Sequence, residues 1–578
     1  MAKTKSRAKP RAKPREPASV VVNYNLYDLP TAFHKAGLAG LAMLIESLKD
    51  RGVLNKGDGE CAWTATDVNV TFTHSLVQKL MDEIYDARIV EVAVKSKWQG
   101  AQIKREDTVE ENDNGKITKS KRFVYDVVQP LGTFLRDKYS DGDGLWLKLW
   151  RDVMWNIVRA RPTTREPYNQ RAAGHSCKEG ATVWAELLKV EKAHATKGSH
   201  TADISSALWP GVQAMNAESV AFKGPAEQIL LLHFWPLTAL LFVPQQVEVD
   251  GSTDFVGYTL AIPEVANIVD FIHDYSRLLN ELPTDARGYR PAGAVIDLPA
   301  EGALSFLDHL AIVAKLQIES GELRYSVGGV EYMHLVKPKS ENNVKTRTSG
   351  RISPNRKLLT GYRSIVDPKA GLEPRFRNAL FRRGLLLALL NNDPWYRPFG
   401  RTLANFDSDI FFRNSRRTAT PDEKGPPQFA NDVARKFQYE AGVFFQTVER
   451  TTTMPEVERP ESQLPMIINR VVRNYVLKRT EDKTGIKLAA FGGQGGNIEW
   501  EKIPAEFNEA KQKLAQSLFL EFRSRKEQAF VDHFAATFFS VTQRIAEADR
   551  LELANVLTSQ QSRDDLKTLT LLSLSANS

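Results

Sequence analysis

The chain has 578 residues, 42% of them hydrophobic, with 78 Lys and Arg residues against 70 Asp and Glu residues. This size and composition predict a globular protein of about two to four domains with large buried cores. The only cysteines, Cys61 and Cys177, exclude a disulfide framework and a four-cysteine metal site, and a cytoplasmic location is the simplest expectation. No signal peptide is predicted, and the most apolar run (229–243) is too short for a membrane span.

The N-terminal segment is strongly basic. Residues 1–16 hold seven Lys or Arg residues and one Glu among alanines and prolines. Because this composition cannot form a packed core, we predict a disordered basic arm over residues 1–18. The sequence leaves two roles open for this arm, which are non-specific contact with nucleic acid and a contribution to solubility.

A mixed α/β region is expected from residue 19 onwards. The apolar spacing in Thr31–Arg51 predicts a helix that ends at Gly52. Gly37 and Gly40 within this helix indicate that another backbone packs very close to it. Alternating apolar residues then predict strands at 68–72, 89–94 and 122–127, with a helix at 75–86 after the first of them.

Two polar segments follow. Between the second and third strands, the turn sequence at 112–115 predicts a long hairpin that projects from a small sheet, with a plain surface loop as the alternative. A tryptophan-rich helix is expected at 145–161, and after it the residues 163–171 predict a polar loop braced by Pro162 and Pro167. This loop is rich in Asn, Gln and Arg, which can form paired hydrogen bonds with base edges, although an ordinary surface turn would also fit.

Beyond a central α/β region (180–335) that includes a strand at Phe255–Ile262, the segment 337–417 carries eighteen basic residues against six acidic ones. Such a concentration of Arg and Lys favours contact with a phosphate backbone, although a solvated basic face is the alternative. Aromatic residues interleave with the cations and are expected to stack on exposed bases. They are Tyr362, Phe376, Phe381, Trp395, Tyr396, Phe399 and Phe411.

The C-terminal part is predicted to be helical. After a Pro/Gly-rich segment (421–427), helices are expected at 433–450, 467–478, 505–544 and 564–574, which together indicate an antiparallel bundle. The fold class is therefore α+β, with small sheets and a projecting hairpin before the bundle. We expect domains at 19–420 and 454–578, with a linker and first helical segment at 421–453.

Motifs for common catalytic chemistry are missing from the sequence. It contains no G-x-x-x-x-G-K-[ST], H-E-x-x-H or G-x-S-x-G motif. His273-Asp274 could belong to a two-metal site, and His175, Cys177, His194 and His200 could form a zinc site, but neither set has the expected companions or spacing. We therefore expect a binding protein without cofactor or metal, and not an enzyme.

Three segments resemble one CRISPR family. They are Tyr24–Leu41, Leu232–Pro236, and the stretch from Val243 to Pro263 that includes Phe255–Tyr258. They look like the large subunit of type I Cascade complexes, in its I-B or Myxan-type branch. The resemblance covers most of residues 20–415, and the helical C-terminus is similar to the small-subunit-like bundle with which the family often ends.

This resemblance implies an RNA-guided DNA-recognition subunit that does not cut. It would read the motif flanking the target, promote R-loop opening and hold the displaced strand. Its partners would be guide RNA, target duplex DNA, the other Cascade subunits, and a helicase-nuclease or transposition proteins. A separate small subunit could also start at Met454 or Met466. The alternatives are a metal-dependent nuclease using His273 and Asp274, or a general RNA-binding scaffold.

Physical reasoning assigns candidate residues to each of these contacts. For the flanking motif and duplex they are Lys116, Lys119, Lys121, Arg122, Arg161, Thr164, Arg165, Asn169, Gln170 and Arg171. For the nucleic-acid backbone they are Arg347, Arg351, Arg356, Lys357, Arg363, Arg375, Arg377, Arg382, Arg383, Arg413, Arg416 and Arg417. For the displaced strand they are Arg470, Arg473, Lys478, Arg523 and Arg525.

Overall fold

The computed structural model describes most of the chain, and the chain forms two compact units. The described residues are 19–113, 116–136, 144–156, 162–204, 208–209, 222–282, 292–314, 326–337, 344–366, 376–412, 437–452, 463–492, 498–542, 545–559 and 563–578. The first unit consists of residues 1–242, 257–287 and 302–354, and the second of residues 243–256, 288–301 and 355–578. The predicted basic arm and the predicted boundary at 420/421 lie outside the described residues.

The first unit begins with a small antiparallel sheet and two helices. Strands β1 (Val20–Asn25), β3 (Asp67–Phe72) and β2 (Gly59–Trp63) pair in that order. Val68, Val70 and Phe72 alternate into the core, which confirms the predicted strand. The Thr73 side chain then accepts the backbone N–H of Leu76 and so caps the next helix. These helices are α1 (Ala32–Asp50) and α2 (His74–Ile84).

The glycines of α1 allow a very close backbone approach. The carbonyl oxygens of Leu231 and Phe234 lie where a side chain at Gly37 or Gly40 would begin. The Thr238 hydroxyl also donates a hydrogen bond of 3.0 Å to the carbonyl of Ala36. The expectation of a closely packed backbone at these glycines is therefore confirmed.

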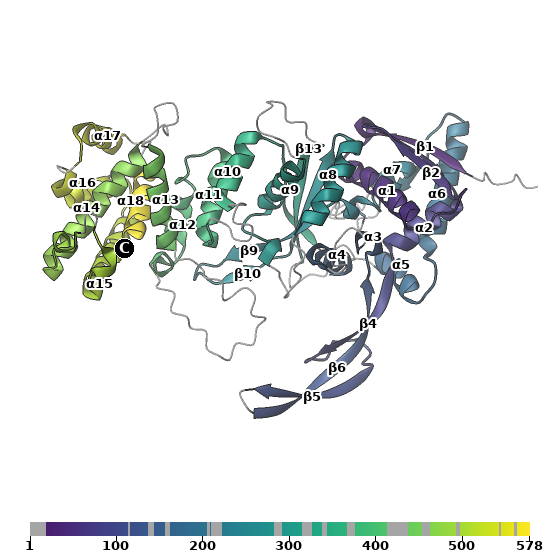
Figure 1. Cartoon of the computed structure of the whole chain (residues 1–578), viewed down its shortest axis with the longest axis horizontal. Helices are drawn as coiled ribbons and strands as arrows, with labels where there is room; N and C mark the ends of the chain where they lie inside the picture. The colour runs from purple at the N-terminus through teal and green to yellow at the C-terminus, as the bar shows by residue number, and fades with distance from the viewer. Residues whose placement is uncertain are drawn as a thin grey trace, which may run out of the picture. The chain divides into compact units, whose positions relative to one another are not determined.

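The predicted hairpin is also confirmed. β4 (Ala87–Val94), β6 (Lys116–Pro130) and β5 (Arg105–Asp113) form a three-stranded antiparallel sheet in the order β4-β6-β5, and its outer part projects beyond the helices at its base (Figure 1). The base of the sheet packs on α4 and α5. Other elements of this unit are α3 (Thr133–Arg136), α4 (Leu145–Asn156), α5 (Pro162–Ala172), α6 (Lys178–Ala195), β7 (Thr201–Asp203), β8 (Lys223–Pro225) and α7 (Ala226–Leu231).

A larger sheet follows in the order β10-β9-β11-β13-β14, with β12 pairing in parallel with β9. The predicted strand at Phe255–Ile262 corresponds to β11, which begins three residues later. The elements are β9 (Leu240–Val247), β10 (Thr253–Phe255), β11 (Tyr258–Val265), α8 (Ile268–Glu281), β12 (Val295–Ile296), α9 (Pro299–Val313), β13 (Val327–Val336) and β14 (Lys345–Ile352).

The second unit is largely helical, as predicted. Its helices are α10 (Arg356–Val366), α11 (Ala379–Asn391), α12 (Phe399–Asn405), α13 (Phe437–Thr452), α14 (Leu464–Thr484), α15 (Ala505–Ser524), α16 (Glu527–Thr542), α17 (Glu547–Thr558) and α18 (Arg563–Ala576). Helix α18 contacts α12, α13, α14 and α15, so the short C-terminal helix forms the centre of this unit. Among the described residues, no helix is long and apolar enough to cross a membrane.

The prediction of one long helix at 505–544 is wrong. The backbone becomes extended at Arg525, and Glu527 has a positive φ of 44°. The Lys567 ammonium from α18 donates hydrogen bonds to the carbonyl oxygens of Arg523 (3.1 Å) and Arg525 (2.6 Å). These bonds satisfy carbonyls that a continuous helix would have bonded internally, so a distant lysine stabilises the break between α15 and α16.

The aromatic residues of the basic stretch form the core of the second unit. Phe381, Phe399 and Phe411 are fully buried, and Phe376, Tyr362 and Tyr396 are nearly so. The half-buried Trp395 packs on Phe444 of α13 at 4.6 Å between ring centroids. The expectation that these rings stack on nucleic-acid bases is therefore wrong, because their faces are covered by other rings.

Candidate nucleic-acid interface

The polar segment at 163–171 is a helix and not a loop. Pro162 occupies the first position of α5, where its fixed φ and missing N–H suit a helix start. Pro167 lies inside the helix and removes one backbone hydrogen bond. Tyr168 compensates, because it is buried and meets the ring of Tyr85 edge-on at 5.2 Å. The prediction of a loop is therefore wrong, because the first proline starts the helix and packing of Tyr168 offsets the second.

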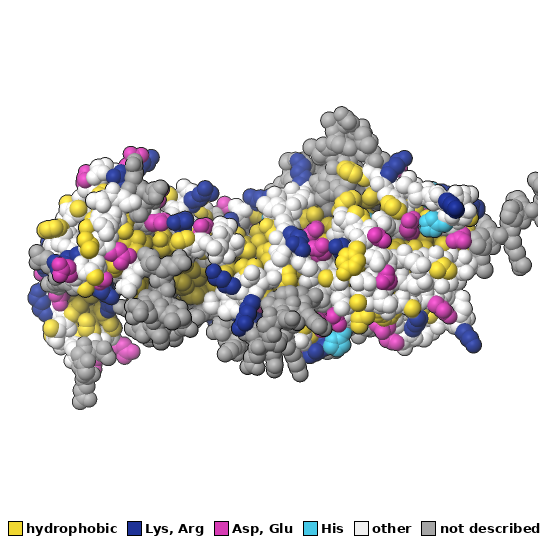
Figure 2. Space-filling view, turned by 90° about the horizontal axis from the view of Figure 1, so that it is seen from above, with side chains coloured by type: hydrophobic (Ala, Val, Ile, Leu, Met, Phe, Trp, Pro, Cys, Tyr) yellow, Lys and Arg dark blue, Asp and Glu magenta, His cyan; other side chains and the backbone are white. Residues whose placement is uncertain are grey.

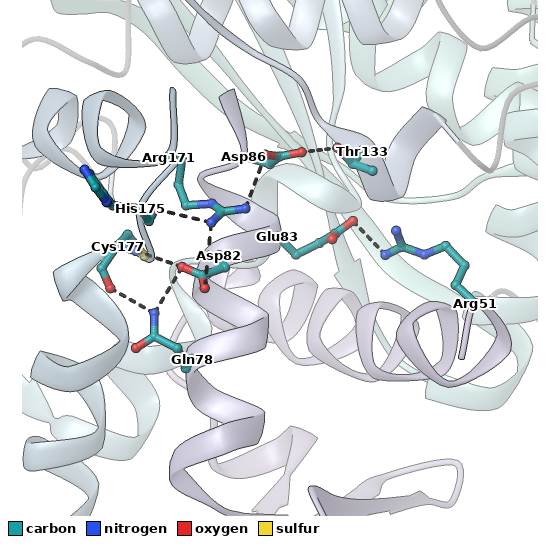
Figure 3. Close-up of polar contacts among 9 residues, drawn as sticks. All are labelled: Arg51, Gln78, Asp82, Glu83, Asp86, Thr133, Arg171, His175 and Cys177. Atoms are coloured by element: carbon teal, nitrogen blue, oxygen red, sulfur yellow. Dashed lines mark hydrogen bonds and ion pairs between the residues drawn. The ribbon is translucent and has the colours of Figure 1, made fainter. Parts of the chain in front are cut away.

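Arg171 fixes the end of α5 to the helices beside it. Its guanidinium lies 3.9 Å from the Asp82 carboxylate, 3.6 Å from the Asp86 carboxylate and 3.2 Å from the carbonyl of His175 (Figure 3). Asp82 also accepts the backbone N–H of Cys177 at 2.8 Å, so α2, α5 and the start of α6 meet in one polar cluster. Arg171 is therefore engaged inside the protein, and we assign it a positioning role.

The exposed face of α5 carries Arg165 and Asn169. These residues are four positions apart and therefore lie side by side on the helix surface. Neither side chain has a hydrogen-bond partner among the described residues. The Gln170 amide, in contrast, contacts Glu166 and the backbone N–H of Lys178. Arg161 and the side chain of Thr164 lie outside the described residues.

The basic residues of β6 lie opposite an acidic strand. β5 contains five Asp or Glu residues, and its Glu106 contacts both Lys97 (3.3 Å) and Lys121 (3.8 Å). Lys121 nevertheless keeps 73% of its side chain exposed. Strand alternation places Lys119 and Lys121 on one face of the sheet and Arg122 on the other. The side chain of Lys116 lies outside the described residues.

The lysine-bearing face of β6 also carries aromatic residues that were absent from the predicted site. Phe123 and Tyr125 continue the alternation of Lys119 and Lys121 on this face. The Lys97 ammonium lies 5.0 Å from the centre of the Phe123 ring, and Trp98 stacks on Tyr125. Reading β6 with a period of two would have revealed this combination of cations and rings.

The basic stretch at 337–417 is divided between the two units, and several of its arginines are engaged. In the first unit, Arg351 of β14 binds Glu264, the carbonyl of Gly328 and the hydroxyl of Ser353. Arg347, in the same strand, is exposed. The expectation that this stretch contacts a phosphate backbone stays a prediction, and Arg375, Arg413, Arg416 and Arg417 lie outside the described residues.

In the second unit, Arg382 belongs to a buried ion-pair cluster. Only 14% of its side chain is exposed, and its guanidinium contacts Glu301 and lies 3.3 Å from the Asp297 carboxylate. Both carboxylates are almost fully buried. We therefore correct the assignment of Arg382, which neutralises buried carboxylates and is not placed to contact a nucleic-acid backbone.

The other backbone candidates of this unit lie on α10 and α11 or just before α11. Arg356, Lys357 and Arg383 are exposed, whereas Arg363 and Arg377 are half-buried. On the face shown in Figure 2, the described Lys and Arg side chains are scattered among Asp and Glu side chains. The charge surplus of the sequence therefore does not appear as a single basic field among the described residues of that face.

The candidates for displaced-strand contact are on α14 and α15 and at Arg525. Arg470 pairs with Asp549 at 3.0 Å, and Arg523 donates to the carbonyl of Ala404 at 2.6 Å. Arg473 and Arg525 are exposed and Lys478 is half-exposed, and these three have no carboxylate partner among the described residues. Met454 lies outside those residues, and Met466 is buried in the first turn of α14.

The residues considered for metal binding do not form a cluster in the described part of the chain. No group of three or more His, Cys, Asp or Glu side chains with metal-binding geometry occurs among the described residues. His273 is 67% exposed and lies 3.2 Å from the carboxylate of its neighbour Asp274. Cys177 is buried, and burial raises the pKa of its thiol to about 12.

Two family models match this chain and together cover most of it. A model of the type I-B CRISPR Cas8b N-terminal domain matches residues 61–320, and a model of the type I-B CRISPR Cas8b C-terminal domain matches residues 327–577. A search of curated proteins found no match.

Proposed function

This chain belongs to the type I-B Cas8b family, the large subunits of CRISPR surveillance complexes, and from that premise we propose that it reads the flanking motif of a DNA target and promotes R-loop opening there. The family assignment confirms the resemblance drawn from the sequence. It also implies membership of Cascade with guide RNA and other Cas subunits. In such complexes guide pairing supplies most of the sequence specificity, and the protein reads only a short duplex motif.

The exposed face of α5 is the observation that best supports a motif reader. A reader must hold its hydrogen-bonding side chains rigidly, since a paired contact to a base edge discriminates by about 1–3 kcal/mol only in good geometry. Arg165 and Asn169 meet this need, because Arg171 and Tyr168 anchor the same helix through other side-chain contacts. Arg can pair with guanine and Asn with adenine in the major groove.

The lysines of β6 and exposed cations of the second unit would supply contacts to the phosphates. R-loop formation exchanges one duplex for another of similar stability, so a few additional backbone contacts shift the balance. Lys119 and Lys121 suit the duplex, and Arg473 and Arg525 suit the displaced strand, because all four are exposed. We leave Arg382 out of this set.

The test is selection from a DNA library with randomised flanks by the reconstituted complex. We expect the double variant Arg165→Ala/Asn169→Ala to bind the preferred flank about 5- to 150-fold more weakly relative to other flanks. The control Lys189→Ala removes an exposed charge on neighbouring α6, where the lysine is already paired with Glu186 at 2.6 Å, and should leave the preference unchanged. An unchanged preference in a folded double variant would refute the reader assignment.

We also propose that the subunit itself does not cut DNA, and that a helicase-nuclease or transposition proteins act after it. This follows the general role of the family as a non-catalytic Cascade subunit. The competing nuclease hypothesis predicts that the purified chain cleaves DNA with magnesium or manganese and that His273→Ala abolishes cleavage. The RNA-scaffold hypothesis predicts tight RNA binding by the isolated chain with no effect of a flanking DNA motif.

A further inference from the structure

Trp98, which follows β4, is held in one orientation against the three-stranded sheet. The Trp98 ring stacks on Tyr125, with 4.6 Å between centroids and 20° between planes. The backbone N–H of Trp98 also donates a 2.9 Å hydrogen bond to the Tyr125 hydroxyl. Tyr125 is 2% exposed, but Trp98 is 42% exposed. One face of the indole is therefore covered by Tyr125, while a large part of the residue stays exposed.

Cations accompany this indole along the same face of β6. Lys97 lies beside Trp98 in the sequence and keeps 60% of its side chain exposed. Lys121 and Lys119 follow on the face shared with Tyr125, at intervals of about 6.6 Å for every two residues of a strand. The face thus combines an exposed aromatic side chain with three exposed lysines, of which Lys97 and Lys121 also contact Glu106.

We propose that Trp98, supported by Tyr125, is a stacking platform for an unpaired nucleobase, with the phosphates of the same DNA strand following Lys121 and Lys119. The inference rests on the proposed function and adds a ligand class to the lysine-bearing face. Inside a duplex both faces of a base are covered by its neighbours. The indole can therefore stack only on a base that is unpaired or terminal, as at the point where a duplex opens.

A protein partner fits this face less well. Among the described side chains of the three strands, the exposed large apolar ones are Ile89 and Val109. They pair with Val128 and Ser120 and therefore lie on the opposite face. Beside Trp98 this face carries the exposed Lys97, Lys119 and Lys121 together with Glu106 and the half-buried Phe123 and Val94. Such a charged setting suits a phosphate-linked base better than the apolar centre of a protein interface.

The experiment compares two labelled single-stranded DNAs of the same length, one with all its bases and one with abasic sites, on the full-length chain. Stacking contributes about 1–3 kcal/mol per base, so we expect Trp98→Ala to weaken binding of the base-bearing strand about 5- to 150-fold. The abasic strand should bind wild type and Trp98→Ala equally, because it has no base that could stack on Trp98. Trp98→Phe should retain most of the affinity, since it keeps an aromatic face.

Ile89→Ala is the matched control, because it truncates an exposed apolar side chain on the other face of the same sheet and should leave both affinities unchanged. Thermal unfolding of each variant establishes that it is folded. If folded Trp98→Ala binds the base-bearing strand as wild type does, the stacking site is refuted. It is also refuted if the variant keeps its affinity for DNA and loses only the binding of a protein partner.

The proposed function is tested separately in the same assay. If wild type binds duplex DNA with a flanking preference but shows no preference for bases over abasic sites, only the stacking platform fails. If the reconstituted complex shows no flanking preference at all, the proposed function fails, whatever Trp98 does.

Discussion

The three-stranded sheet β4-β6-β5 and the helices α10–α12 contain the same kinds of residue but use them in opposite ways. Both are rich in cations and aromatic rings. In α10–α12 the rings of Phe381 and Phe399 form the core, and Arg382 neutralises buried carboxylates. In the sheet, Trp98 and Lys121 keep much of their surface in solvent. The abundance of Arg and aromatic residues therefore does not identify a binding surface, because the same residues also build cores.

The strongest test of this contrast is the removal of Arg382. Arg382→Ala leaves Asp297 and Glu301 buried without their cation, which should lower the unfolding free energy by about 3–5 kcal/mol. The control Arg383→Ala removes an exposed cation at the next position of α11 and should cost about 1 kcal/mol or less. Chemical unfolding of both variants provides the measurement. A stable Arg382→Ala variant with weakened DNA binding would reverse our assignment.

A second test concerns two buried histidines of the first unit. Burial lowers the pKa of His34 and the pKa of His233 to about 4 each, well below the ordinary value for histidine. Between pH 6.5 and 4 the unfolded chain therefore binds protons at these histidines more readily than the folded chain does. The free energy of unfolding is highest above about pH 6.5 and falls as the pH drops towards 4. By linkage, each histidine lowers the free energy of unfolding by about 3 kcal/mol at pH 4 relative to neutral pH.

Two groups beside His233 also affect how the stability changes with pH. The Tyr85 hydroxyl lies 2.8 Å from Nδ1 of His233, and a Glu179 carboxylate oxygen lies 4.0 Å from Nε2. Burial raises the pKa of Glu179, which offsets part of the loss at low pH. We expect His34→Gln/His233→Gln to flatten the stability profile between pH 7 and 5, as measured by urea unfolding. The exposed His273→Gln control should keep the slope of wild type.

Local patterns predicted much of the fold. Alternation located β3, the turn sequence at 112–115 located the hairpin, and the glycines of α1 predicted a close backbone, which is that of Leu231 and Phe234. The predictions that were wrong concern features that depend on residues distant in the chain. The polar composition of α5 gave no sign that Asp82 and Asp86 would hold it, and the break after α15 depends on Lys567 from α18.

The candidate site could be predicted only in part for the same reason. A list of basic residues does not show which of them are paired, and Arg382 could not be told apart from Arg383 without Asp297 and Glu301. Trp98 was missed because it follows β4 and meets Tyr125 only when the strands pair. The period-two pattern of β6 was the available signal.

The smallest expected effect concerns the lysines on the open face of the sheet. Each phosphate contact adds about 1 to the slope of log affinity against log salt, so Lys119→Ala/Lys121→Ala should lower that slope by about 2 without changing sequence preference. The matched control is Lys104→Ala/Arg105→Ala, which removes the same charge from the same sheet. Lys104 is already bound to Glu91 and Asp126, and Arg105 to Glu91 and Asp107. These two cations therefore have fewer hydrogen bonds available for a phosphate. Titration of duplex DNA at several salt concentrations measures both slopes. Equal losses in the two variants would mean that net charge, and not the exposed face of β6, determines binding.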